Sequence, residues 1–193
     1  MNYTVVINRE YGSGGRLIGR LLAEKLNIPC YDNDLIKLTA KQSGFSEDYI
    51  KEAMEKKTAS LLYSLYMTSL PIADQIFLAQ SQVITDLAQK ESCVIVGGCA
   101  DYVLKEKKDL IKVFIHAPFE KRLQRVREEY KEPAEDYKSY VTRMDKKRVT
   151  YYNYFTQYKW GNARDYNIAL DSSAGINVCV DVICEYVRKY LEF

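Results

Sequence analysis

The chain opens with a short apolar run that leads directly into a segment rich in glycine. Residues 4–7, Thr-Val-Val-Ile, form the apolar run, which is typical of a strand buried on both faces of a sheet. Residues 9–15 contain three glycines, and from Arg16 onward apolar residues recur at positions 17, 18, 21, 22 and 26. This last spacing is that of a helix. The order predicts a strand, a glycine-rich loop and a helix.

The same change of pattern recurs along the chain. Further strands are expected at residues 28–31, 93–98, 111–115 and 168–170. Helices are expected between Asn33 and Gly44, from Ser46 toward Lys57, from Pro71 onward, and over residues 118–130, 136–151 and 176–190. Strands that alternate with helices predict an α/β fold, with a five-stranded parallel sheet covered by helices on both faces. The apolar stretch at residues 60–70 is either a partner surface or a wall of an acceptor pocket.

Length and charge limit the range of functions. The chain has 193 residues with no internal repeat and no linker, so residues 1–193 are expected to form one domain. The net charge of +2 is too weak to indicate nucleic acid or an anionic membrane as a partner. An anion site in this protein must therefore come from local clustering of basic residues.

The distribution of apolar residues and cysteines predicts the cellular compartment of the protein. No apolar run approaches the roughly 20 residues that a membrane-spanning helix needs, and the first residues resemble a strand rather than a secretory signal. The five cysteines form no CxxC pair, which favours small buried core residues in a reducing compartment over metal ligands or disulfides. We expect a cytoplasmic protein; the sequence indicates no particular oligomeric state.

The loop after the first strand has the chemistry of a phosphate site. The start of a helix carries backbone N–H donors and a partial positive charge, and glycines allow the backbone to approach an anion closely. Gly12, Ser13, Gly14, Gly15 and Arg16 stand at this point of the chain. The alternative is an ordinary glycine turn at the end of a strand. Its place after the first strand of an α/β chain favours nucleotide binding.

Four segments then resemble one family, the cytidylate kinase-like proteins. They are residues 7–15 (INREYGSGG), 31–36 (YDNDLI), 97–101 (GGCAD) and 143–152 (RMDKKRVTYY). They stand in the family's order and extend over nearly the whole chain. The resemblance implies a three-layer P-loop kinase fold with a helical lid. It implies an acceptor-binding helical region at residues 45–92 and a lid region at residues 131–160.

The resemblance also implies an activity, which is transfer of the γ-phosphate of ATP to a nucleoside monophosphate, CMP or dCMP, with Mg²⁺. Backbone N–H groups from Gly12 to Leu17 would cradle the ATP phosphates. Five side chains would act in catalysis: Asp32, Arg122, Arg125, Arg143 and Arg148. Asp32 would also hold Mg²⁺ through water. Guanidinium groups suit this task because they remain charged and bind phosphate in a bidentate manner.

Four further residues are candidates for binding the acceptor: Asp34, Gly97, Asp101 and Asp145. Asp145 would orient one of the lid arginines. For Asp34 an equally good interpretation is a carboxylate that stabilises the first turn of a helix. For the arginines the alternative is a solvated basic helix.

The loop departs from the common phosphate-binding pattern G-x-x-x-x-G-K-[ST]. Either Gly15 or Arg16 occupies the lysine position, and Leu17 stands where a metal-binding hydroxyl is expected. Ser13 offers a hydroxyl at a different position, and Gly98 stands where the family often has arginine. Two alternatives to a nucleoside monophosphate kinase therefore stay open. One is a kinase for another small molecule, since Asp32 and Asp34 resemble the paired aspartates of shikimate kinase-like enzymes. The other is a non-catalytic nucleotide sensor.

Overall fold

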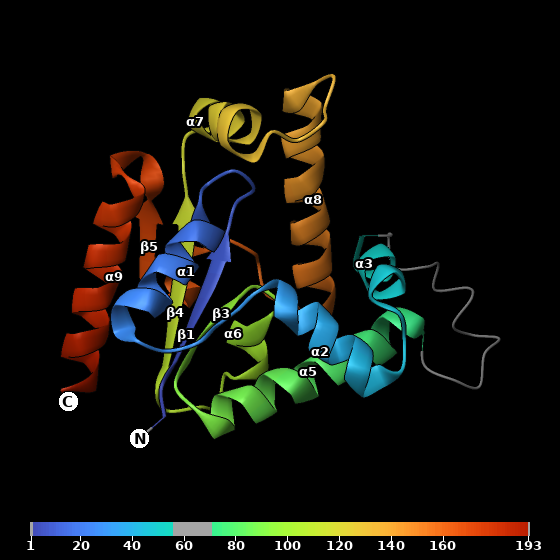
Figure 1. The fold of residues 1–193 in the computed structure, drawn as a ribbon, viewed down its shortest axis with the longest axis vertical. Coiled ribbons are helices and arrows are strands. Elements are labelled where there is room, and N and C mark those ends of the chain that lie inside the picture. Colours follow the sequence, from blue (N-terminus) through green and yellow to red (C-terminus); the bar gives the residue numbers. More distant parts are fainter. Residues whose placement is uncertain (1, 56–70, 193) are drawn as a thin grey trace.

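Five parallel strands form one sheet, in the order β2-β3-β1-β4-β5 (Figure 1). The computed structural model describes residues 2–55 and 71–192. The strands are β1 (Thr4–Arg9), β2 (Cys30–Tyr31), β3 (Cys93–Val96), β4 (Leu110–His116) and β5 (Ile168–Asp171). In the central strand, Val5 pairs with Val94 of β3 and with Ile111 of β4. The parallel arrangement brings all the carboxyl ends of the strands to one edge.

Two helices, α1 (Gly15–Leu26) and α9 (Ile176–Leu191), cover one face of the sheet. Alternate residues of a strand point to opposite faces, and Val5 and Ile7 of β1 are fully buried on this one. They pack in one core with residues of both helices: Ile18, Leu22, Ala23, Cys179, Val180, Ile183 and Cys184. The apolar residues of α1 and α9 thus form one helical layer of the fold against the sheet.

The opposite face is covered by α2 (Asn33–Ser43), α5 (Ile72–Lys90) and the short helix α6 (Ala100–Val103). Val6 of β1 lies on this face. It shares a second core with residues of these helices and of β3: Leu35, Val83, Ile84, Ala88, Ile95 and Ala100. The adjoining helix α3 (Glu47–Glu55) contacts α2 and α5.

A third group of elements stands beyond the carboxyl ends of the strands. It comprises α7 (Phe119–Arg125), a π-helical turn (Val126–Tyr130) and α8 (Tyr137–Thr156). In Figure 1, α7 lies at the top of the molecule, and α8 runs from the top down one side of it. Four buried residues form their core: Tyr11, Leu123, Val126 and Val141. Because Tyr11 belongs to the loop between β1 and α1, this core fixes the loop against the helices.

The predicted fold class, a five-stranded parallel sheet between helices, is confirmed. The structure adds three short elements that the pattern did not predict: α6 and two 3₁₀ turns on either side of β5, Ala163–Asp165 and Ser172–Ala174. The helix expected over residues 118–130 changes to π geometry at Val126. The stretch at residues 60–70 and the end of the helix expected toward Lys57 lie outside the described residues. Among the described helices, none is long and apolar enough to span a membrane.

Candidate active site

The glycine loop joins the carboxyl end of β1 to the amino end of α1. Gly12 and Gly14 have φ angles of +80° and +82°, a conformation that glycine adopts without steric cost. A Cβ atom on Gly12 would also lie 2.7 Å from the carbonyl oxygen of Arg122. Gly14 is the N-cap of α1, and the first N–H groups of a helix have no partner within it. The loop therefore ends in a set of backbone donors suited to phosphate.

Ser13 contributes to the shape of this loop. Its side chain is fully buried, and its hydroxyl donates to the carbonyl oxygen of Glu10 at 2.9 Å. The carbonyl oxygen of Ser13 accepts a hydrogen bond of 2.6 Å from the hydroxyl of Ser172. The Ser13 hydroxyl thus serves the loop itself.

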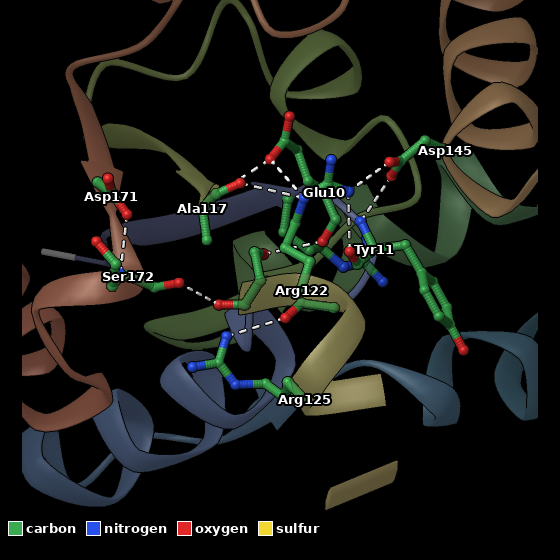
Figure 2. A network of polar contacts seen from close by, with 12 residues as sticks. Glu10, Tyr11, Ala117, Arg122, Arg125, Asp145, Asp171 and Ser172 are labelled. Carbon is green, nitrogen blue, oxygen red and sulfur yellow. Dashed lines mark hydrogen bonds and ion pairs between the residues drawn. The ribbon is translucent and has the colours of Figure 1, made fainter. Parts of the chain in front are cut away.

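Arg122 of α7 lies behind the loop and holds it in place (Figure 2). Its Nη1 atom donates to the carbonyl oxygen of Tyr11 at 3.1 Å and to Oδ2 of Asp145 at 2.5 Å. Its Nε atom donates to the carbonyl oxygen of Ala117 and lies 3.2 Å from Oε2 of Glu10. The side chain is only 8% exposed. Arg122 therefore joins three segments: the loop, α7 and α8.

Asp145 and Arg125 complete this arrangement. Asp145 accepts a hydrogen bond of 2.7 Å from the backbone N–H of Tyr11, so its carboxylate is bound to protein donors on both oxygens. It orients Arg122 of α7 rather than a lid arginine, because α8 packs directly on the loop. Arg125 donates from Nη1 to the carbonyl oxygen of Gly12 at 2.9 Å. Neither Arg122 nor Arg125 lines the two cavities that lie on the other side of the loop.

The first of these cavities has a volume of about 680 Å³ and extends over the loop and the start of α1. Its wall includes three of the loop glycines and residues from α1, the π-helical turn and α8. Among them are Gly12, Gly14, Gly15, Arg16, Leu17, Tyr130 and Arg148. The cavity thus places open space directly over the backbone donors.

The second cavity, of about 220 Å³, adjoins the ends of β1, β2 and β3. Asp32 follows β2 and lines this cavity, with 18% of its side chain exposed. It forms an ion pair with Nε of Arg16 and lies 3.7 Å from Nη2 of Arg9. Gly97, with Gly98, forms the wall after β3. Of the described residues that line this cavity, Asp32 alone carries a carboxylate.

Arg148 of α8 lines both cavities. Its Nη1 atom donates to the carbonyl oxygen of Arg9 at 2.9 Å, and its guanidinium lies 5.0 Å from the ring centre of Tyr11. Burial and the neighbouring Arg9 lower the pKa of Arg148 to about 9, although Asp145 opposes this effect. Arg9 and Arg16 line both cavities as well. Three cations thus stand together where the walls of the two cavities meet, and Asp32 is paired with one of them. The wall of the first cavity also carries the carboxylates of Glu10, Glu129 and Glu132. A bound anion would relieve the mutual repulsion of the three cations.

Ser13, Arg122, Arg125 and Asp145 serve the loop and do not line either cavity. Three further predicted site residues lie away from both the loop and the cavities. Asp34 is exposed and lies 3.5 Å from Nζ of Lys37, as expected of a carboxylate in the first turn of a helix. Arg143 is exposed, with its guanidinium 5.3 Å from the ring centre of Tyr140.

Asp101 is the third of these residues. It is buried in α6 and accepts a hydrogen bond of 2.6 Å from the hydroxyl of Tyr152. Burial raises the pKa of Asp101, and the hydrogen bond from Tyr152 opposes this increase. The contact with Tyr152 ties α6 to α8.

Arg9 and Gln80 are among the residues that line the second cavity and that sequence reasoning did not select. Gln80 is 1% exposed, and its Oε1 atom accepts a hydrogen bond of 3.3 Å from the hydroxyl of Tyr151. The sequence held a signal for it, because Gln80 stands four residues from both Ile76 and Ile84, on the apolar face of α5. A polar residue at such a position is buried and needs a partner.

The donor set around Asp32 can be compared with the requirements of Mg²⁺. Among the described residues, no group of three or more His, Cys, Asp or Glu side chains could hold a metal ion by itself. Mg²⁺ in phosphoryl-transfer sites is held by one or two carboxylates, by water and by substrate phosphates. A single carboxylate beside a phosphate site fits that mode of binding.

Comparison with known proteins shows what this chain is similar to. The model of the cytidylate kinase-like family matches residues 4–174. The shikimate kinase of Aquifex aeolicus (strain VF5) is 31% identical over 126 residues, which are 63% of this chain and 64% of that protein. The chain thus covers less than two thirds of this relative.

Solved structures extend the likeness to the whole chain. An uncharacterized protein from Eubacterium ventriosum ATCC 27560 has a TM-score of 0.72 at 27% identity, covering 97% of this chain and 99% of its own. A gluconokinase from Sinorhizobium meliloti 1021 has a TM-score of 0.61 at 15% identity, with coverage of 98% and 94%. At 15% identity, the likeness to the gluconokinase is a likeness of fold alone.

Proposed function

Because the chain belongs to the cytidylate kinase-like family, we propose that it transfers the γ-phosphoryl group of ATP, with Mg²⁺, to a nucleoside monophosphate. CMP and dCMP are the first acceptors to test. The observation that carries the proposal is that three cations, Arg9, Arg16 and Arg148, line both cavities. Anionic groups bound in the two cavities would meet among these cations. Phosphoryl transfer depends mainly on such positioning and charge stabilisation.

The larger cavity is the proposed ATP site. Backbone N–H groups at Gly14 to Leu17 would bind the phosphates, and Ser13 would keep the loop in shape. Arg148 would stabilise the negative charge on the transferred group. Asp32 would hold Mg²⁺ through water, and the ion would neutralise charge on the phosphates.

The smaller cavity is the proposed acceptor site. Gln80 of α5 and Tyr151 of α8 lie on its wall and are hydrogen-bonded to each other. They would offer an amide and an aromatic face to a planar base, while Arg148 would bind the acceptor phosphate. This assignment gives residues 45–92 an acceptor-binding role through α5. It gives residues 131–160 the role of a lid through α8.

A second candidate is a kinase for a different small molecule. The relative that is 31% identical to this chain is a shikimate kinase, and the second cavity, about 220 Å³, is small. The same cations would then receive a carboxylate instead of a phosphate. A non-catalytic nucleotide sensor is the third candidate, motivated by the absence of lysine from the glycine loop.

Production of ADP from ATP and Mg²⁺ separates these candidates. CMP, dCMP, UMP, AMP and shikimate would each be added as the acceptor, and ATP binding would be measured in parallel by calorimetry. We expect CMP or dCMP to stimulate ADP production most strongly. Stimulation by shikimate alone would keep the kinase and replace the acceptor. ATP binding without stimulation by any acceptor would favour the sensor.

A further inference from the structure

The glycine loop carries its positive charge at an unusual place. In the pattern G-x-x-x-x-G-K, the lysine follows the second glycine and reaches the β- and γ-phosphates of the nucleotide. If the second glycine is Gly14, the N-cap of α1, the lysine position falls on Gly15. The first glycine of the pattern falls on Arg9. Glycine and cation have thus exchanged ends of the loop.

The structure gives a physical reason for this exchange. Arg9 is the last residue of β1, and its side chain crosses the first residue of α1. A Cβ atom on Gly15 would lie 2.6 Å from Cβ and 2.9 Å from Cγ of Arg9. A Cβ atom on Gly97 would overlap Nη1 of Arg9. Gly15 thus leaves room for the first carbons of the Arg9 side chain, and Gly97 leaves room for its guanidinium group.

The guanidinium of Arg9 ends where the two cavities adjoin. Arg9 lines both cavities, and its side chain is 16% exposed. Burial lowers the pKa of Arg9, nearby Arg16 adds to this effect, and Asp32 opposes it. The charge of Arg9 is held away from bulk water, with one carboxylate at 3.7 Å. An anion that enters either cavity would be drawn to it.

We propose that Arg9 supplies, from the end of β1, the positive charge that the lysine of the common pattern supplies from the start of the helix. This inference rests on the proposed function, and it assigns to Arg9 the β- and γ-phosphates of a nucleoside triphosphate. Arg16 is a less suitable replacement, because its side chain is 60% exposed and turns toward Asp32. The exchange of Gly15 and Arg9 also explains how a loop without lysine keeps a phosphate-binding charge.

Calorimetric titration with ATP and Mg²⁺ tests this assignment in the full-length protein. Arg9→Gln keeps the part of the side chain that packs on Gly15 and removes the charge. We expect the affinity for ATP to fall about 10- to 100-fold, since hydrogen bonds to charged groups contribute roughly 1.5–3 kcal/mol. Arg188→Gln, on the exposed surface of α9 with 58% of its side chain accessible, makes the same change in net charge. It is expected to bind ATP as the wild type does.

An exchange experiment separates this role from a purely structural one. Arg9→Gly removes the charge, and Gly15→Lys alone forces a side chain against the stem of Arg9, so each is expected to weaken ATP binding. The double variant Arg9→Gly with Gly15→Lys restores the common pattern. We expect it to recover ATP affinity to within about tenfold of the wild type. Thermal melting of each variant reports whether it is folded.

The outcomes distinguish the inference from the proposed function. If the wild type binds no ATP, the proposed function is wrong, and the role of Arg9 is wrong with it. If the wild type binds ATP and folded Arg9→Gln binds it equally well, only the role of Arg9 is overturned. A folded double variant that binds no better than Arg9→Gly would overturn it too.

Discussion

Two pairs of arginines stand on opposite sides of the glycine loop and do different things. Behind the loop, Arg122 and Arg125 donate to the carbonyl oxygens of Tyr11 and Gly12 (Figure 2). On the cavity side, Arg9 and Arg148 line open space. Arg148 also donates to a carbonyl oxygen, that of Arg9. The difference is that the second pair lines the cavities and the first pair does not. The function of an arginine here depends on which acceptors surround it.

The comparison also shows why the two sides need each other. A loop that presents its N–H groups to a ligand turns carbonyl oxygens to its other side, and these need donors. Arg122 and Arg125 provide them, and Asp145 fixes Arg122 through a bond of 2.5 Å. The shape of the loop is therefore maintained from behind.

The largest effect that we expect is a loss of stability on the side behind the loop. Arg122→Ala would remove the cation that pairs with Asp145. It would also remove the donor that the carbonyl oxygens of Tyr11 and Ala117 share. Breaking a fully buried ion pair costs about 3–5 kcal/mol; here the arginine is buried and Asp145 is 20% exposed, so we expect a loss toward the lower end of that range. Chemical denaturation would measure it. Lys121→Ala, at an exposed position of the same helix, is expected to change the free energy of unfolding by less than about 0.5 kcal/mol. An Arg122→Ala protein of unchanged stability that lost only turnover would place Arg122 with the cavity-side arginines.

On the cavity side, we expect a smaller change in the free energy of unfolding but a specific loss of turnover. With an active acceptor, Arg148→Ala should lower kcat about 10²- to 10³-fold, because a charge that stabilises the transition state is lost. Because Arg148 would also bind the acceptor phosphate, kcat/KM for the acceptor should fall further than kcat. Lys146→Ala, exposed on the same helix, serves as the control and is expected to retain turnover. Unchanged turnover in Arg148→Ala would remove Arg148 from the mechanism and break the distinction between the two sides.

The smallest effect is expected at the carboxylate of the cavity side. Asp32→Asn should raise the Mg²⁺ concentration for half-maximal activity about tenfold, as is typical when a residue that holds a metal through water is altered. Titration of ADP production with Mg²⁺ would measure the shift. Asp48→Asn, a change at a fully solvated carboxylate on α3, should leave the titration curve in place. The role of Asp32 would be refuted by a curve that is the same in Asp32→Asn and the wild type.

Local patterns predicted much of the framework. The β-branched run before the glycines predicted β1, and helical spacing from Arg16 predicted α1. Pro71 and Asp136 marked the beginnings of α5 and α8 as observed. These signals are local, since side-chain spacing and capping act within a few residues. The π-helical turn at Val126 was not predicted, because nothing in the residues themselves distinguishes it from α-helix.

The candidate site was predicted less completely. Asp32, Gly97 and Arg148 were selected and line the cavities, whereas Asp34 and Arg143 were selected and are exposed elsewhere. The sequence contained the arginines but not the acceptors each would meet. Arg122 and Arg148 are both arginines on helices near the end of the sheet. Only the packing of α8 on the loop brings Arg122 to Asp145 and places Arg148 on the walls of the cavities.

The sequence by itself thus determined the order of strands and helices, the family and the place of the glycine loop. Each follows from residues that are close together in the chain or from motifs in a fixed order. The tertiary structure decided which cation accompanies the loop. Gly15 and Arg9 are six residues apart, while Gly97 follows another strand, β3. Their relation becomes visible only when the parallel strands bring their ends to one edge, because steric exclusion acts between neighbours in space.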